Sequence, residues 1–298
     1  MCGIVGGVSD RNVLPILIEG LKRLEYRGYD SAGVAFRENS KISLIKAKGR
    51  VLDLENKLPE MKVKSNQGIA HTRWATHGVP SEKNAHPQIS ENKIFVVHNG
   101  IIENHLKLRE KLQSEGVKFR SDTDTEVIIQ LCSYYIEQGF NNKDAFLRTI
   151  KRLKGAFALC LMFKDDDKRL YVTKRSAPLV IGYGKSDIFV GSDAVSLSNL
   201  INKVIFLDED DVAVISKKET EIFNKTGKKI ERKKKSVELN TIYIPNKMLC
   251  GSIKDSKLPL LENRYSKGQT RIFVCENKVC QIPVEEAEKA FELMKKNL

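Results

Sequence analysis

The sequence predicts an α+β fold in which two β-sheets pack face to face and helices cover them. Two regions have the patterns of short strands, one within residues 3–97 and one from Gly155 onward. Segments whose apolar residues follow helical spacing lie between and around these regions. No apolar run reaches the roughly 18 residues of a membrane span, and no secretory signal is visible. We therefore expect no membrane partner.

The first strand-rich region opens with an apolar, glycine-containing stretch that suits a buried strand. Apolar residues then recur at Leu14, Ile18, Leu21 and Leu24, a spacing that predicts a helix. In chain order we expect a strand over 3–7, a helix over 13–26, a tight connection over 27–33, strands over 34–36 and 42–46, a short helix over 52–61 and a strand over 68–73.

The middle of the chain is predicted to be a loop followed by helices. Residues 73–87 hold Gly78, Pro80 and Pro87 and follow no regular period, which indicates a loop. A buried strand over 94–97 ends at His98-Asn99-Gly100, and Thr123–Glu126 carry the signal of a helix N-cap. We expect helices over 103–115, 124–138 and 143–153, strands over 156–163, 170–173, 179–183, 187–190, 204–207, 212–215 and 220–223, and a short helix over 194–200.

Composition bounds the classes of partner. The 298 residues carry a net charge of +13, of which +6 lies between Lys217 and Lys235. This basic stretch holds no aromatic residue except Phe223 and no recognition-helix pattern, so a solvated face is favoured over a nucleic-acid site. The six cysteines are scattered and form no disulfide framework, which predicts reduced thiols and a cytoplasmic protein.

Cys2 is the candidate nucleophile. Removal of Met1 would place a free α-amine on the residue that carries the thiol. The amine titrates at about 7.7 to 8.0 and the thiol at about 8.5, so the amine can take the thiol proton near neutral pH. A nucleophile and its base then share one residue. Many chains begin Met-Cys by chance, and the dipeptide alone does not establish catalysis.

Four other features each have an ordinary structural explanation. Taken alone, Arg73 is more consistent with a structural ion pair and Asp124 with a helix cap. Trp74 suits a core residue as well as a lid, and Asn99-Gly100 is more typical of a hairpin turn.

The histidines do not predict a metal site. His77, His86 and His98 are possible ligands, but no cysteine or carboxylate accompanies them at ligand spacing. We expect no metal and no cofactor.

Together, the candidates meet the needs of amide hydrolysis through a thioester. Cys2 supplies the thiol and the amine, while the Asn99 amide and the Gly100 N–H can donate to an oxyanion. The Arg73 guanidinium can bind an α-carboxylate with two hydrogen bonds, and Asp124 can accept from an α-ammonium. This set predicts an amino acid with a carboxamide side chain, glutamine or asparagine, as the substrate.

A resemblance adds what spacing does not give. The chain contains, in order, the motifs MCGIVG from Met1, LEYRGYDSAG from Leu24, HTRWATHG from His71, NAHP from Asn84, VVHNGIIENH from Val96, SDTDTE from Ser121, KRSAPLVIGYG from Lys174 and IFNKTGK from Ile222. It resembles the amino-terminal glutaminase domain of the glucosamine-6-phosphate synthase (glutamine–fructose-6-phosphate aminotransferase) family. The resemblance extends to about Lys235, roughly four-fifths of the chain.

This resemblance implies an N-terminal-nucleophile αββα sandwich that takes L-glutamine as the ammonia donor for amino-sugar synthesis. It assigns a role to each matching residue: Cys2 as nucleophile with its own amine as base, Asn99 and Gly100 as oxyanion hole, Arg73, Thr76, His77, Gly100 and Asp124 as glutamine ligands, and Trp74 as a lid that retains ammonia.

The resemblance predicts a glutaminase domain over 1–236 and a linker and extension over 237–298. Nothing in the 298 residues matches the family's sugar isomerase domains, so the acceptor half would come from a separate chain. In the extension, PNKML from Pro245 and IFVCENKVCQIPV from Ile272 are similar to the carboxyl end of a thioredoxin-domain-containing family. That family's catalytic parts are missing, and Cys275 and Cys280 lack the spacing of its redox pair. We expect a strand over 271–275 and a closing helix over 283–296.

Three functional hypotheses follow. The first is a glutamine-hydrolysing enzyme that supplies ammonia to an amino-sugar synthase. The second is a catalytically weak glutamine-binding module that lacks the synthase half. The third, disfavoured by the long motifs, is an amidotransferase that serves another acceptor. The sequence predicts no oligomeric state.

Overall fold

The computed structural model describes residues 2–58, 63–91, 93–198 and 200–236, and also 275–276, 279–280, 284–285 and 289. The chain divides into two compact units, Met1–Ser236 and Val237–Leu298. In the second unit, β16 (Cys275–Glu276) pairs antiparallel with β17 (Val279–Cys280), which places Cys275 opposite Cys280. Of the closing helix expected over 283–296 only residues 284, 285 and 289 are described, and of these only Lys289 is helical. Nearly all of the strand expected over 271–275 lies outside the described residues.

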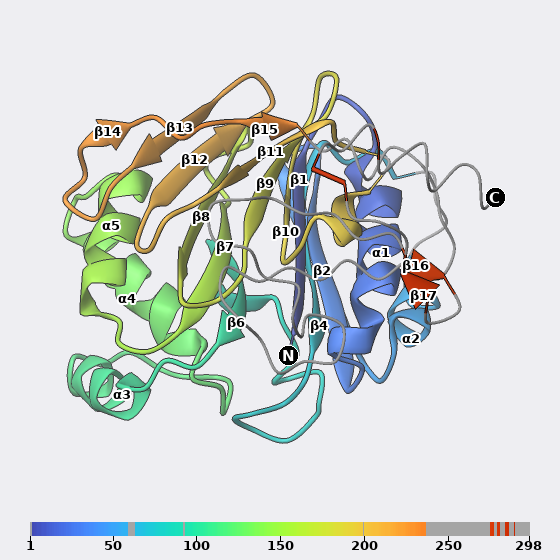
Figure 1. Ribbon diagram of the computed structural model, residues 1–298. Coiled ribbons are helices and arrows are strands. Elements are labelled where there is room, and N and C mark those ends of the chain that lie inside the picture. Colours follow the sequence, from blue (N-terminus) through green and yellow to red (C-terminus); the bar gives the residue numbers. More distant parts are fainter. Residues whose placement is uncertain are drawn as a thin grey trace. The chain divides into compact units, whose positions relative to one another are not determined.

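The first sheet of the Met1–Ser236 unit has β1 near its centre (Figure 1). Its strands follow the order β15-β11-β9-β10-β1-β4-β2-β3, and every pairing between them is antiparallel. The strands are β1 (Gly3–Val8), β2 (Ser31–Glu38), β3 (Lys41–Lys48), β4 (Gln67–Arg73), β9 (Val180–Tyr183), β10 (Ile188–Gly191), β11 (Lys203–Phe206) and β15 (Lys235–Ser236).

Strand β2 begins earlier than the sequence predicts. Ser31 stands opposite Arg73 of β4, and Gly33 stands opposite His71. Residues 31–33 were expected to belong to a tight connection, and that expectation is wrong. A partner strand supplies backbone hydrogen bonds to residues whose local preference is for a turn, so pairing overrides preference here.

The second sheet is also antiparallel and lies against the first. Its order is β14-β13-β12-β8-β7-β6-β5. The strands are β5 (Gln88–Ser90), β6 (Ile94–Gly100), β7 (Phe157–Phe163), β8 (Arg169–Arg175), β12 (Val212–Ser216), β13 (Thr220–Phe223) and β14 (Lys229–Ile230).

Helices cover the outer face of each sheet (Figure 1). The first sheet carries α1 (Val13–Leu24) and α2 (Val51–Glu55), and the second carries α3 (His105–Ser114), α4 (Glu126–Glu137) and α5 (Asn142–Arg152). One apolar core, which includes Ile4, Val97 and Cys160, fills the space between the sheets. A second core joins the other face of the β6–β7 sheet to α3, α4 and α5. The predicted two-sheet α+β architecture, with layers in the order αββα, is confirmed.

The structure revises several helix termini, including the end of α1 and the start of α4. Helix α1 ends at Leu24, and Glu25–Arg27 form a separate 3₁₀ turn that the predicted helix over 13–26 had included. Helix α4 begins at Glu126, and no side chain caps it. The N-cap expected within Thr123–Glu126 is wrong because the hydroxyl of Thr125, the residue before the helix, contacts His86 and His98 instead of a helix N–H.

The buried Arg37 of β2 connects the two sheets. Its Nε donates to Oε1 of Gln67 in β4 at 2.7 Å. Its Nη2 donates to the carbonyls of Phe163, Lys164 and Asp166, where β7 turns toward β8. The guanidinium therefore links β2 and β4 of the first sheet to the β7–β8 connection of the second.

In the part of the chain that the structure describes, no helix combines the length and the hydropathy needed to cross a membrane.

Candidate active site

Cys2 lies immediately before β1, with its thiol against the backbone of Trp74. The Trp74 N–H donates to Sγ of Cys2 at 3.2 Å, and Sγ lies 3.5 Å from the Trp74 carbonyl oxygen. Burial raises the pKa of the Cys2 thiol above its ordinary value, while the Trp74 hydrogen bond and the positive charges of the terminus and Arg73 partly oppose that rise. The thiol consequently needs a nearby base to become a nucleophile near neutral pH.

The carbonyl of Cys2 is held independently of its thiol. It accepts from Nε of Arg27 at 3.1 Å and from Nδ2 of Asn99 at 3.0 Å. Arg27 is buried and forms an ion pair with Asp193 at 3.2 Å, and the Tyr26 hydroxyl donates to the same carboxylate. The sequence analysis missed Arg27 as a site residue, although it lies inside the LEYRGYDSAG motif, which could have pointed to it.

Asn99 and Gly100 end β6 where it pairs with β7. They stand opposite Ala158 and Phe157, so the hairpin-turn interpretation of this dipeptide is wrong. Gly100 has a φ of +117°, and a Cβ on it would lie 2.0 Å from the Ala156 carbonyl oxygen. Only glycine fits this backbone without displacing its neighbour.

The guanidinium of Arg73 folds back onto the loop that follows β4. Its Nη2 donates to the carbonyl of His77 and, at 3.1 Å, to that of Gly78. Its buried Nη1 has no hydrogen-bond partner among the described residues, and Arg73 forms no ion pair with any of them. Burial lowers the pKa of Arg73, an effect that the charges of Asp30, Cys2 and Asp124 partly oppose. The structural ion-pair interpretation therefore fails for the described residues, and Nη1 is left without a hydrogen-bond acceptor among them.

Trp74, Thr76 and His77 lie on the same loop and are more accessible. Trp74 is 49% exposed and contacts Tyr29 edge to face, with ring centroids 5.5 Å apart. It is not a core residue. His77 lies 3.4 Å from the Thr76 hydroxyl through Nδ1, and its ring packs against His105 at 4.9 Å.

The Asp124 carboxylate is buried and faces the segment after Gly100. Its Oδ2 accepts from the Ile102 N–H at 2.8 Å. The neighbouring Thr125 hydroxyl contacts Nε2 of His86 and Nδ1 of His98, each at 2.8 Å. Asp124 is thus not a helix cap, and it lies within the electrostatic reach of Arg73.

Three histidines form a buried cluster behind Asn99. The rings of His71 and His86 pack edge to face at 4.3 Å, and those of His86 and His98 at 6.3 Å. Complete burial lowers the pKa of His71 to about 3, and it also lowers the pKa values of His86 and His98. All three are therefore neutral at pH 7. No group of three or more His, Cys, Asp or Glu side chains among the described residues could hold a metal ion.

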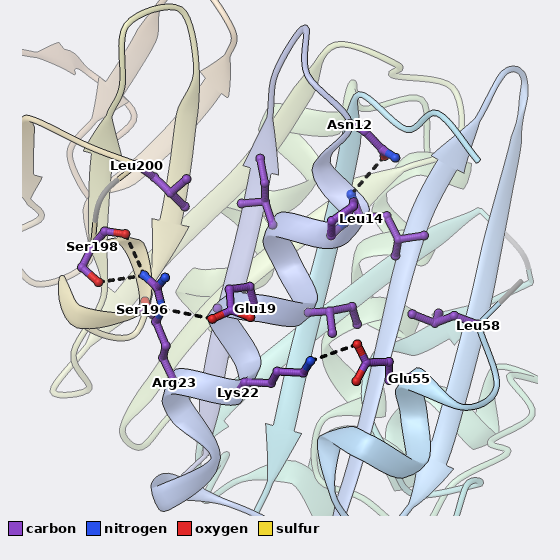
Figure 2. Close-up of a pocket in the computed structure, with 14 residues that line it drawn as sticks. Asn12, Leu14, Glu19, Lys22, Arg23, Glu55, Leu58, Ser196, Ser198 and Leu200 are labelled. Atoms are coloured by element: carbon purple, nitrogen blue, oxygen red, sulfur yellow. Dashed lines mark hydrogen bonds and ion pairs between the residues drawn. The ribbon is translucent and has the colours of Figure 1, made fainter. Parts of the chain in front are cut away.

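A cavity of about 560 Å³ lies elsewhere, against α1 (Figure 2). Apolar side chains that include Leu14, Leu58 and Leu200 line it, and the charged groups at its edge are paired, Lys22 with Glu55 and Arg23 with Ser198 and Glu19. None of the predicted site residues lines this cavity.

Known proteins resemble this chain in sequence. Residues 71–199 match the family model described as a glutamine amidotransferase domain. The chain is 44% identical over 247 residues to the glutamine–fructose-6-phosphate aminotransferase (isomerizing) of Mesorhizobium japonicum, a match that covers 83% of this chain and 40% of that protein. It is 47% identical over 239 residues to the enzyme of the same name from Shewanella oneidensis, a match that covers 80% of this chain and 39% of that protein. The chain thus spans about two fifths of the length of these curated relatives.

Solved structures share the fold. The glutamine phosphoribosylpyrophosphate amidotransferase from B. subtilis, complexed with ADP and GMP, superposes with a TM-score of 0.67 at 24% identity, covering 75% of this chain and 49% of that one. A glutamine aminotransferase class-II domain protein from Silicibacter pomeroyi superposes with a TM-score of 0.53 at 16% identity, covering 75% of this chain and 99% of that one.

Proposed function

The chain contains a glutamine amidotransferase domain with the N-terminal-nucleophile αββα fold, and on this premise we propose that it hydrolyses L-glutamine to glutamate and ammonia. One observation supports the proposal best. The Cys2 sulfur contacts the backbone of the residue after Arg73, while the Cys2 carbonyl contacts the Asn99 amide. The proposed nucleophile therefore lies between a guanidinium suited to a carboxylate and an amide donor suited to an oxyanion.

The proposed reaction begins with Met1 removed. The α-amine of Cys2 takes the thiol proton, and sulfur attacks the carboxamide carbon of glutamine to form a C–S bond and an oxyanion. The amine returns the proton to the departing nitrogen, the C–N bond breaks and ammonia leaves a thioester. Water then attacks the thioester carbon, with the amine accepting its proton, and the C–S bond breaks to give glutamate and a thiol.

Asn99 Nδ2 and the Gly100 N–H are the proposed donors to the oxyanion. Both hydrogens of Nδ2 already have acceptors, the Cys2 carbonyl at 3.0 Å and the Ser192 hydroxyl at 2.9 Å. An oxyanion would share or replace the first of these contacts because it carries more negative charge than a carbonyl oxygen. Such a donor is typically worth about a hundredfold to a thousandfold in kcat.

Recognition of the amino-acid end is proposed to use Arg73 and Asp124. The unpartnered Nη1 of Arg73 supports binding of the α-carboxylate, and the buried Asp124 carboxylate supports binding of the α-ammonium. Thr76 and His77 complete the proposed glutamine site, and the exposed Trp74 ring acts as its lid.

We further propose that the ammonia serves the synthesis of glucosamine 6-phosphate from fructose 6-phosphate. The names and sequences of the curated relatives support this acceptor, and the chain aligns with about two fifths of each. The acceptor site would then lie outside these 298 residues.

The decisive experiment measures glutamate release from glutamine by the purified chain, with Cys2→Ala as the matched control. Mass spectrometry of the intact protein establishes whether Met1 has been removed. We expect release by the processed native chain only. If processed native protein binds glutamine yet releases no more glutamate than Cys2→Ala, the hydrolase proposal is wrong and the chain is a glutamine-binding module.

A further inference from the structure

His71 approaches the Asn99 side chain from the side opposite Cys2. It lies in β4, next to Ile4 of β1, and is completely buried. Its Nε2 lies 2.9 Å from the carbonyl oxygen of His98 and 3.1 Å from Oδ1 of Asn99. One ring nitrogen therefore contacts both the strand that carries Asn99 and the Asn99 amide itself.

The His98 carbonyl determines which nitrogen of His71 carries the proton. A carbonyl oxygen only accepts hydrogen bonds, so Nε2 of His71 must be the donor. Burial keeps the ring neutral, because it lowers the pKa of His71 to about 3, and Nδ1 therefore has no proton. This agrees with Nδ1 being buried without a hydrogen-bond partner among the described residues. The same Nε2–H also faces Oδ1 of Asn99.

The amide of Asn99 can take two orientations, in which either its oxygen or its nitrogen faces Cys2. The two orientations fill nearly the same space. A donor at Nε2 of His71 requires Oδ1 on its side and so directs Nδ2 toward Cys2. The Ser192 hydroxyl can donate or accept, so it does not distinguish the two orientations. The Cys2 carbonyl does distinguish them, but in the proposed reaction an oxyanion shares or replaces that contact. The His71 contact selects nitrogen whether or not the Cys2 carbonyl keeps its own.

We propose that His71 is a positioning residue of the reaction proposed above, on which this inference rests. Its Nε2–H, fixed by the His98 carbonyl, holds the Asn99 amide with nitrogen toward the oxyanion. In the opposite orientation the lone pairs of Oδ1 would face the developing negative charge, which would raise the barrier to thioester formation.

Two substitutions test the proposal. In His71→Gln the glutamine Nε2 can reach the place of the imidazole Nε2 and still donate, whereas His71→Met fills the space without a donor. For His71→Met we expect kcat to fall about tenfold to a hundredfold, part of the effect of losing an oxyanion donor. We expect the KM of both variants to stay within about threefold of the native value, because the amino-acid end of glutamine is bound elsewhere. The kcat of His71→Gln should stay within about fivefold of the native value, because this variant keeps a donor.

Alkylation of Cys2 by iodoacetamide distinguishes a loss of Asn99 orientation from a general disruption of the site around Cys2. That reaction needs the thiol and no oxyanion donor. Its rate should stay within about twofold of native in both variants, since neither changes the thiol. A native kcat in His71→Met, a kcat in His71→Gln as low as that of His71→Met, or alkylation that falls in parallel with kcat would each overturn the proposal.

Nitrogen NMR of the native protein gives an answer that requires neither folding of a variant nor turnover. The sequence holds five histidines, and backbone correlation assigns the ring signals of His71 among them. A neutral ring protonated at Nε2 supports the proposal, and protonation at Nδ1 overturns it. If the native chain releases no glutamate, the proposed hydrolase fails, while this spectrum still decides the tautomer on its own.

Discussion

Cys2 illustrates how one residue of this site is held at two points. Its carbonyl is fixed by Arg27 and Asn99, and its sulfur contacts the Trp74 backbone. Since the carbonyl fixes the position of the Cα atom, rotation about the side-chain bond is the main freedom left to the thiol. The direction of sulfur attack would then be set largely by rotation about this bond.

Asp124→Asn tests the proposed contact with the α-ammonium. The Asn side chain keeps an oxygen that can accept from the Ile102 N–H, so the fold is preserved. Loss of a charge-assisted hydrogen bond costs about 1.5–3 kcal/mol, so KM for glutamine should rise roughly tenfold to a hundredfold, as steady-state kinetics will measure.

The control for this substitution is Asp122→Asn, two residues away. Asp122 is exposed and forms an ion pair with Lys83. Such a surface pair should contribute little to the binding of glutamine. We expect a native KM. A native KM in Asp124→Asn as well would show that Asp124 does not bind the substrate.

Gly100→Ala tests the backbone at the end of β6. A Cβ would lie 2.0 Å from the Ala156 carbonyl oxygen, at a φ of +117°. We expect a loss of about 3 kcal/mol or more in the free energy of unfolding, from strain and displacement together. Gly139→Ala, at a φ of +89° with nothing within 4 Å, should cost only about 1–2 kcal/mol. Equal losses in urea denaturation would contradict the steric argument.

At the scale of elements, Arg37 is one of the side chains that join strands of different sheets. It binds Gln67 of β4 and the carbonyls at the end of β7. These carbonyls are buried, so the arginine stabilises the β7–β8 connection as well as the packing of one sheet on the other.

Arg37→Met should destabilise the protein by about 3 kcal/mol or more, because several buried polar groups lose their partner. Glutamine turnover at temperatures where both proteins are folded should stay within about twofold, since Arg37 contacts no proposed site residue. The matched arginine is Arg148, which is exposed over Phe140 and should lose less than about 1 kcal/mol in Arg148→Met. Thermal melting compares the two variants, and equal losses would refute the bridging role of Arg37.

At the scale of the molecule, the buried histidines couple stability to pH. The pKa values of His71, His86 and His98 are lowered in the folded state, that of His71 to about 3, whereas unfolded histidine titrates near about 6.5. As pH falls below 6.5 the unfolded chain therefore binds protons that the folded chain does not. Stability is full above this range and declines as the pH is lowered.

We expect the free energy of unfolding to fall between pH 7 and pH 5.5, by about 1 kcal/mol from His71 and by a further amount from His86 and His98. Urea denaturation over this range measures the loss. His86→Gln, which keeps a group able to bond to the Thr125 hydroxyl, should weaken the dependence. A stability that does not change with pH would contradict the neutral, buried cluster.

Residue type and local order were sufficient to predict much of this protein. The periods of apolar residues predicted most helices and strands to within a few positions, because burial on one face or both repeats along each element. The amino acids that a thioester mechanism needs could also be chosen from their chemistry alone, as Cys2, Asn99, Arg73 and Asp124 show. Their roles remain predictions until turnover is measured.

The tertiary structure decided which partner each polar group takes. Pairing with β4 made Ser31–Gly33 a strand, and the end of β6 made Asn99–Gly100 a strand terminus instead of a turn. Arg27 reached the Cys2 carbonyl, and His71 reached Asn99, across separations of 25 and 28 residues. Hydrogen bonds are short and directional, so their partners depend on strand register and on the packing of one sheet against another, which local sequence does not encode.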